Sequence, residues 1–338
     1  MPLKDYIGFC ILICLVLLMP HLMVNDYYLG VLVFAAFNCL ACIGLCLLMG
    51  YAGQISLGHG AFIAIGAYSS GIFTTAFGWS PWAAMAAGAF AAMVIAMAVG
   101  IPTLRLKGHY LAMATLGFAS IVHIVAVAAT GFTGGPAGMS GIPGLRLFGY
   151  PLDSDLKYYY FAWAAVIIGL YFAFNLIHSR VGRGLRAIHG SGDAAEAVGV
   201  NTAVYKIQVF ALSAVYASVG GSLYACYVNY IDPGPFDVMH SVMLVTMVAV
   251  GGLRHLWGAV IGAVLLSVLP EILSMAAAPL RGIGIAYRPD YDILVYGGIL
   301  LLIMMFLPDG LFAGIASAGR SGIAVVKKYA RGGRIAGK

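Results

Sequence analysis

Charged side chains are scarce in this sequence, and their scarcity excludes an ordinary water-soluble fold. Asp, Glu, Lys and Arg together make up 9% of its 338 residues, whereas 62% are hydrophobic and the mean hydropathy is +0.97. A soluble domain needs more polar surface than this to face water. The apolar residues form long unbroken runs rather than short alternations, so the sequence predicts membrane-spanning α-helices and not a β-barrel.

Catalytic and nucleotide-binding motifs are also missing. The sequence has no glycine-rich phosphate loop followed by Lys and Ser or Thr, no Ser, His and Asp arrangement, and no cluster with metal-ligand spacing. We therefore expect a chain that is not an enzyme and holds no cofactor or metal of its own. The net charge of +6 comes from cations between apolar runs, which indicates orientation in a membrane rather than binding to nucleic acid.

Cysteine is rare as well, and every cysteine lies inside an apolar run. The six are Cys10, Cys14, Cys39, Cys42, Cys46 and Cys226. No His or carboxylate joins them at metal-ligand spacing, so we expect reduced thiols that pack as small hydrophobic groups.

About ten apolar runs have roughly the 20 residues that cross a bilayer. They are residues 6–24, 28–49, 56–77, 82–100, 109–130, 158–177, 206–229, 238–250, 257–277 and 291–312. No small-residue cleavage site follows the first run, so we interpret it as an uncleaved span rather than a signal peptide. The eighth run is short, and the second and third are open to interpretation as one interrupted helix.

Basic residues orient these spans. Cations gather at 105–107, at 180–186 and in the tail after Asp309, which contains no acid, and such loops face the cytoplasm. An even number of predicted spans lies between each cluster and the next, so all three clusters can lie on the same side of the membrane. The sequence thus predicts an all-α polytopic membrane protein with about ten transmembrane helices, glycine-interrupted helices in each half, and both termini in the cytoplasm.

The same orientation divides the chain into regions. Residues 1–313 form the transmembrane domain, and residues 314–338 form a basic cytoplasmic tail. Within the first region, the Gly- and Pro-rich loop 131–157 lies outside and the polar segment 179–206 lies inside.

Glycine-rich breaks interrupt the apolar pattern in each half of the chain. Residues 50–60 read GYAGQISLGHG, and a second break, VGGLRHLWGAVIGAV, begins at Val250. Paired breaks of this kind are typical of a transport pathway between internal repeats. The predicted pathway residues are Gly53, Gln54, Ser56, His59, Gly251 and Gly252. The alternative is that both breaks are tight interhelical turns with small residues for close packing.

The segment 179–206 contains a short capped helix. Asp193 followed by Glu196 fits an N-cap and its partner three residues later, and Gly199 stands where a left-handed C-cap belongs. Such a helix is too short to be stable alone. Held between two spans, it suits transmission of a push from a docked partner, although an ordinary amphipathic connector is equally compatible with the pattern.

Other polar residues lie inside the apolar runs. We favour structural roles for Glu271, which follows Pro270. For His59, His123 and His240 we favour buried side chains whose ring nitrogens are hydrogen-bonded. Further candidates for the pathway are Asn38, Thr115, Ser241 and Thr246.

Several passages together give the chain a resemblance to a known family. They are GYAGQISLGHGAF at Gly50, LKGHYLAMATLGFASI at Leu106, FTGGPAGMSGIPG at Phe132, GRGLRAIHGSGDAAEAVGVNTAVYK at Gly182, LPE at Leu269 and FLPDGLFAG at Phe306. In this order and spacing they resemble the LivM-type permeases of branched-chain amino acid ABC importers, from about Ala36 to Phe312.

The resemblance implies a non-catalytic permease subunit in a bacterial inner membrane. Its implied partners are a LivH-like second permease subunit, two cytoplasmic ATPases that bind ATP and Mg, a periplasmic substrate-binding protein and membrane lipid. By position, the segment that couples to the ATPases carries Asp193, Ala194, Ala195, Glu196 and Gly199. Just upstream, residues 189–192 are less charged than is usual in the family.

Two other functions remain open at this point. A stand-alone secondary transporter usually carries buried acids in its spans, and Glu271 alone gives it little support. A structural scaffold would use the basic tail to bind anionic lipid, but it leaves the glycine breaks and the capped helix unexplained.

Overall fold

A computed structural model describes residues 3–22, 25–103, 108–147 and 149–277, with isolated positions at 297, 298, 301, 305, 311 and 312. Its elements are α1 (Leu3–Leu22), α2 (Asp26–Cys46), η1 (Leu47–Tyr51), α3 (His59–Thr75), α4 (Pro81–Thr103), α5 (His109–Ala128), α6 (Thr130–Thr133), η2 (Gly135–Ala137), β1 (Met139–Ser140), β2 (Arg146–Leu147), β3 (Tyr150–Pro151), α7 (Asp155–His178), α8 (Arg180–Gly190), α9 (Gly192–Ala197), α10 (Thr202–Val228), β4 (Tyr230–Ile231), η3 (Gly234–Phe236), α11 (Val238–Gly251) and α12 (Leu256–Ala277).

The chain is an all-α polytopic membrane protein. Within the described ranges, seven helices are long and apolar enough to cross a membrane, and α11 is a shorter apolar helix. Each of the first nine predicted runs coincides with a helix, and the second and third are separate helices. Apart from those isolated positions, the tenth predicted run falls outside the described residues, and so do the basic loop 105–107 and the basic tail.

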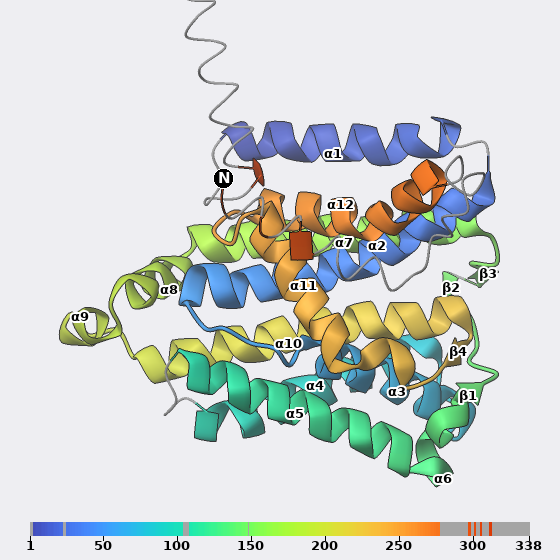
Figure 1. The fold of residues 1–338 in the computed structure, drawn as a ribbon, viewed down its shortest axis with the longest axis horizontal. Coiled ribbons are helices and arrows are strands. Elements are labelled where there is room, and N and C mark those ends of the chain that lie inside the picture. The colour runs from blue at the N-terminus through green and yellow to red at the C-terminus, as the bar shows by residue number, and fades with distance from the viewer. Residues whose placement is uncertain are drawn as a thin grey trace, which may run out of the picture.

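The centre of the bundle is formed by α2 and α10. Their most apolar windows are 83% and 78% buried, compared with 11% for α1 and 22% for α5. Most of the long helices run nearly side by side, with α1 along one edge and α11 crossing the others obliquely (Figure 1). Peripheral helices can keep apolar side chains on their outer faces because lipid, unlike water, accepts them.

Small residues bring α3 and α10 into backbone contact. A Cβ atom added to Gly66 would lie 2.0 Å from the Ser218 carbonyl oxygen, and one added to Gly221 would lie 2.0 Å from that of Ile63. The Ser222 hydroxyl also donates to the Gly66 carbonyl at 3.1 Å. Because lipid tails are as apolar as side chains, helices in a membrane associate through close packing and hydrogen bonds of this kind.

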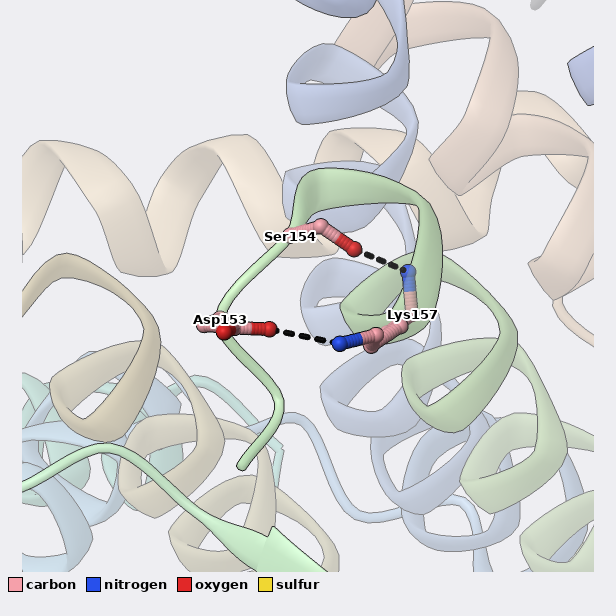
Figure 2. Close-up of polar contacts among 3 residues, drawn as sticks. All are labelled: Asp153, Ser154 and Lys157. Atoms are coloured by element: carbon pink, nitrogen blue, oxygen red, sulfur yellow. Dashed lines mark hydrogen bonds and ion pairs between the residues drawn. The ribbon is translucent and has the colours of Figure 1, made fainter. Parts of the chain in front are cut away.

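Short antiparallel strand pairs close one end of the bundle, where β1 pairs with β4 and β2 pairs with β3. Helix α7 begins there after Ser154, whose side chain accepts a hydrogen bond from the Lys157 N–H (Figure 2). The Lys157 ammonium donates to Asp153 at 2.7 Å. This hydrogen bond lowers the pKa of the exposed Asp153 carboxyl below its ordinary value.

Helices α8 and α9 lie at the opposite end, at the left of Figure 1. The sequence predicts one short helix within residues 179–206, and the structure contains a second. Helix α8 is amphipathic: Leu185 and Ile188 are buried, while Arg183 and Arg186 are exposed. Its apolar stripe packs α8 against the end of the bundle, and α9 follows α8 directly in the chain.

Candidate functional site

Helix α9 is six residues long and is capped at both ends. The Ser191 side chain accepts a hydrogen bond from the Ala194 N–H at 3.3 Å. At the other end Gly199 has φ +84°, and its N–H donates to the Glu196 carbonyl while the Val200 N–H donates to that of Ala195. These two bonds form a Schellman motif.

The geometry corrects one cap and confirms the other. The N-cap is Ser191, not Asp193, which lies in the first turn of α9. Both residue types cap helices well, and the extended backbone at Ser191 decides between them. Gly199 adopts the predicted left-handed conformation.

Glu196 makes a different contact from the predicted one. It does not cap α9 through a backbone N–H; instead its carboxylate accepts a hydrogen bond from the Thr202 hydroxyl at the start of α10. With Ala195 buried, this bond fixes α9 to the bundle. Asp193, Ala194 and Glu196 are exposed.

Val198, the C-cap residue of α9, is the functional candidate that sequence reasoning missed. Its apolar side chain is 78% exposed. Helix α9 lies at the end of the bundle beyond the apolar spans (Figure 1), where lipid does not cover it. The signal in the sequence is Gly199, which predicts a turn that redirects the chain directly after Val198 and leaves this residue at the tip.

The first glycine break enters the helix bundle rather than turning at its surface. Residues 53–58 are not helical, and α3 begins only at His59, which is fully buried. The Leu57 N–H donates to the Thr115 hydroxyl at 3.0 Å, and the Gly60 N–H donates to the Ser241 hydroxyl at 2.9 Å. Side chains of α5 and α11 therefore satisfy one backbone N–H of the break and one of the first turn of α3.

His59 is a hydrogen-bonded buried histidine, as predicted. Its Nε2 lies 2.5 Å from the Ser213 hydroxyl on α10, and its Nδ1 lies 3.3 Å from that of Ser56. Ser213 was not among the predicted pathway residues, because no local pattern distinguishes it from other helical serines. The break thus contacts α5, α10 and α11 together.

Other predicted polar residues make interhelical or local contacts. Asn38 donates to Ser267 at 3.0 Å, and Thr246 donates to a carbonyl of its own helix. The Tyr27 hydroxyl donates to Glu271 at 2.9 Å. Glu271, the acid that supported a secondary transporter, therefore links α12 to α2.

The second glycine break has the geometry of a tight interhelical turn. A Cβ atom on Gly251 would lie 1.9 Å from the Gly258 carbonyl oxygen, and Gly252 has φ +116°. The turn also packs on η1, which follows α2, where the Tyr51 hydroxyl donates to the Arg254 carbonyl. Close packing accounts for Gly251 and Gly252, and their role in a pathway stays a prediction.

A polar hollow of about 420 Å³ brings the first break and α9 together. Its lining residues are Ala52, Gly53, Gln54, Gly108, Leu111, Ile188, His189, Gly192, Asp193, Glu196, Thr202, Ala203 and Lys206. Gly53 has φ +67°, and a Cβ atom there would lie 3.0 Å from the Nδ1 atom of His189. Two predicted sites that are far apart in the sequence therefore share one space.

The family is decided by a match that covers most of the chain. Residues 27–304 match the family described as the permease component of the branched-chain amino acid transport system. The chain belongs to this family. The break, the hollow and α9 all lie inside the matched region of the permease family.

Members of the permease family from bacteria and archaea resemble the chain. The LivM permease protein of the high-affinity branched-chain amino acid transport system of Escherichia coli (strain K12) is 27% identical over 292 residues, or 80% of this chain and 66% of that protein. A probable LivM permease of Methanocaldococcus jannaschii is 25% identical over 217 residues, 62% of each chain. The corresponding LivH permease of Salmonella typhimurium is 25% identical over 289 residues, 80% of this chain and 90% of that protein.

The match spans slightly less than two thirds of the length of the Escherichia coli relative. No solved structure matches the chain.

Proposed function

We propose that the chain is the membrane-spanning permease subunit of an ATP-driven importer for branched-chain amino acids or related small polar metabolites. The relatives are named as permease proteins of branched-chain amino acid transport systems. Helix α9 is the segment through which partner ATPases move the bundle.

The observation that carries this proposal is the rigid attachment of α9. A helix of six residues is not stable alone in water, yet this one has a serine cap, a Schellman motif and a bond from Thr202 to Glu196. It lies at one extremity of the bundle (Figure 1). A push on α9 therefore passes to α8 and α10 rather than bending a loose loop.

Orientation follows from the arginines of α8. Arg180, Arg183 and Arg186 are exposed at the α9 end, and short loops rich in Arg and Lys face the cytoplasm. That end is cytoplasmic, and the strand pairs lie outside. With residues 291–312 as a tenth span, both termini lie in the cytoplasm of a cell whose inner membrane holds the complex.

The complete importer contains further chains. A LivH-like subunit pairs with this one, as the resemblance to LivH permeases supports. Two cytoplasmic ATPases bind ATP and Mg, a periplasmic protein delivers the substrate, and lipid surrounds the bundle.

Substitutions on α9 test the proposal. Val198→Asp places a charge on the exposed tip, at a side chain that is 78% exposed. Full burial of a valine contributes about 1.5–3 kcal/mol, so we expect roughly a tenfold or greater loss of ATPase association, with lower leucine uptake and lower substrate-stimulated ATP hydrolysis. Glu196→Ala is expected to act in the same direction while membrane insertion stays intact.

Thr202→Val is the matched control for Glu196→Ala, because it removes the same hydrogen bond and leaves the carboxylate on the surface. Equal losses in the two variants would assign Glu196 to holding α9, and a larger loss in Glu196→Ala would assign it to docking. Wild-type uptake and ATP hydrolysis in both Val198→Asp and Glu196→Ala would contradict the proposal.

A further inference from the structure

The polar hollow beside α9 has the size and chemistry of a small-molecule site. Its volume of about 420 Å³ lies in the range of about 300–1,000 Å³ that is typical of ligand pockets. A second cavity, of about 210 Å³, is lined by Phe34, Phe37, Tyr224 and Phe236 together with residues of α3 and α11. Of these two cavities, the polar hollow is the one whose lining combines carboxylates, a lysine and an amide.

Opposite charges line the hollow. Asp193 and Glu196 contribute carboxylates from α9, and Lys206 contributes an ammonium from the first turns of α10. The Thr202 hydroxyl donates to Glu196, but a carboxylate has about four acceptor positions, so the group retains capacity to accept further hydrogen bonds. The side chain of Lys206 is half-buried, which strengthens its attraction for an anion.

Gln54 provides an independent sign of a ligand. It lines the hollow and is 7% exposed, and its amide oxygen has no hydrogen-bond partner among the described residues. An acceptor buried without a donor destabilises the fold. The hollow is the space next to this amide in which a donor group can be accommodated.

We propose that the hollow binds a small zwitterion, an α-amino acid, on the cytoplasmic side of the permease. The ammonium of the ligand donates to Glu196 and Gln54, and its carboxylate accepts from Lys206. The inference rests on the proposed function, because transport supplies the amino acid and places α9 in the cytoplasm. A ligand in this position bridges α9 and the break at Gly53, so the accumulated product opposes the movement that couples the ATPases.

Calorimetric titration of the full complex in lipid nanodiscs, prepared without the periplasmic binding protein, tests the inference. The probes are L-leucine, 3-methylbutylamine, which lacks the carboxylate, and 4-methylpentanoate, which lacks the ammonium. We expect leucine to bind and each analogue to bind at least about tenfold more weakly, because each loses a charge-assisted hydrogen bond.

Two variants locate the binding. Gln54→Leu keeps the size of the side chain and removes the amide, and Lys206→Met removes the cation. Each is expected to weaken leucine binding about tenfold or more. Lys157→Met is the matched control, since it removes an exposed cation at the opposite end of the bundle and is expected to leave the affinity unchanged.

The outcomes separate this inference from the proposed function. If leucine does not bind, or binds equally well to Gln54→Leu and Lys206→Met, the hollow holds only water and the inference is wrong. ATP-dependent leucine uptake by the same complex, with its binding protein restored, is measured in parallel. Uptake without binding in the hollow contradicts this inference alone, whereas a complex that takes up neither an amino acid nor a related small polar metabolite contradicts the proposed function.

Discussion

The substitution Gly199→Ala tests how the capped helix α9 contributes to transport, because it changes the backbone preference and leaves side-chain packing nearly unchanged. Gly199 has φ +84°, and a Cβ atom added there would meet nothing within 4 Å. The cost is therefore conformational: a residue with a Cβ atom in left-handed backbone costs about 1–2 kcal/mol. That free energy corresponds to a factor of roughly 5–30 in the population of the capped helix.

Hydrogen exchange measures this population directly. The Val200 N–H closes the Schellman motif on the Ala195 carbonyl, so we expect its exchange in Gly199→Ala to accelerate by roughly the same factor of 5–30. Exchange in the buried α2 and α10 is expected to stay unchanged, and ATP-dependent uptake is expected to fall.

Gly199→Asn is the control, because asparagine adopts left-handed backbone more readily than alanine. It is expected to preserve most of the protection and most of the uptake. Exchange at the wild-type rate in Gly199→Ala, or equal loss of protection in the alanine and asparagine variants, would contradict this role of the left-handed turn.

Two further predictions concern the helix bundle and its outer end. Ser213→Ala removes the partner of His59 Nε2 and is expected to destabilise the bundle by about 1–3 kcal/mol in thermal unfolding, whereas Ser218→Ala, whose buried hydroxyl has no partner in the described part of the chain, is expected to have a smaller effect. Because the Lys157 hydrogen bond lowers the pKa of Asp153, the stability that this pair contributes is present above the ordinary aspartate pKa and is lost as pH falls through the lowered one. Lys157→Met is expected to move the carboxyl titration of Asp153, followed by NMR, back towards its ordinary range.

The helices could be predicted from the sequence because their signal is local. Apolar runs of membrane-spanning length identify them without knowledge of their neighbours, and nine of the predicted runs coincide with helices. Gly199 could be predicted for a similar reason, since a left-handed helix end favours glycine strongly. The cap at Ser191 was missed because Asp193 offers an equally good capping group two residues later.

The contacts that build the candidate site could not be predicted, because they join distant parts of the chain. Ser213 bonds to His59 across 154 positions, and neither residue has a local pattern that names the other. Gly251 fits a pathway and a close helix crossing equally well in the sequence. Its position against the Gly258 carbonyl depends on how α11 and α12 cross.

The most direct test of the account is the sidedness and protection of the α9 tip. Val198→Cys, in a chain whose exposed Cys10 and Cys14 are replaced by alanine, is treated with a membrane-impermeant maleimide. We predict labelling in inside-out vesicles stripped of ATPases, none in intact cells, and loss of labelling when the ATPases are added back. Labelling from the outer face, or labelling that bound ATPases leave unchanged, would contradict the claim that α9 couples this permease to its motor.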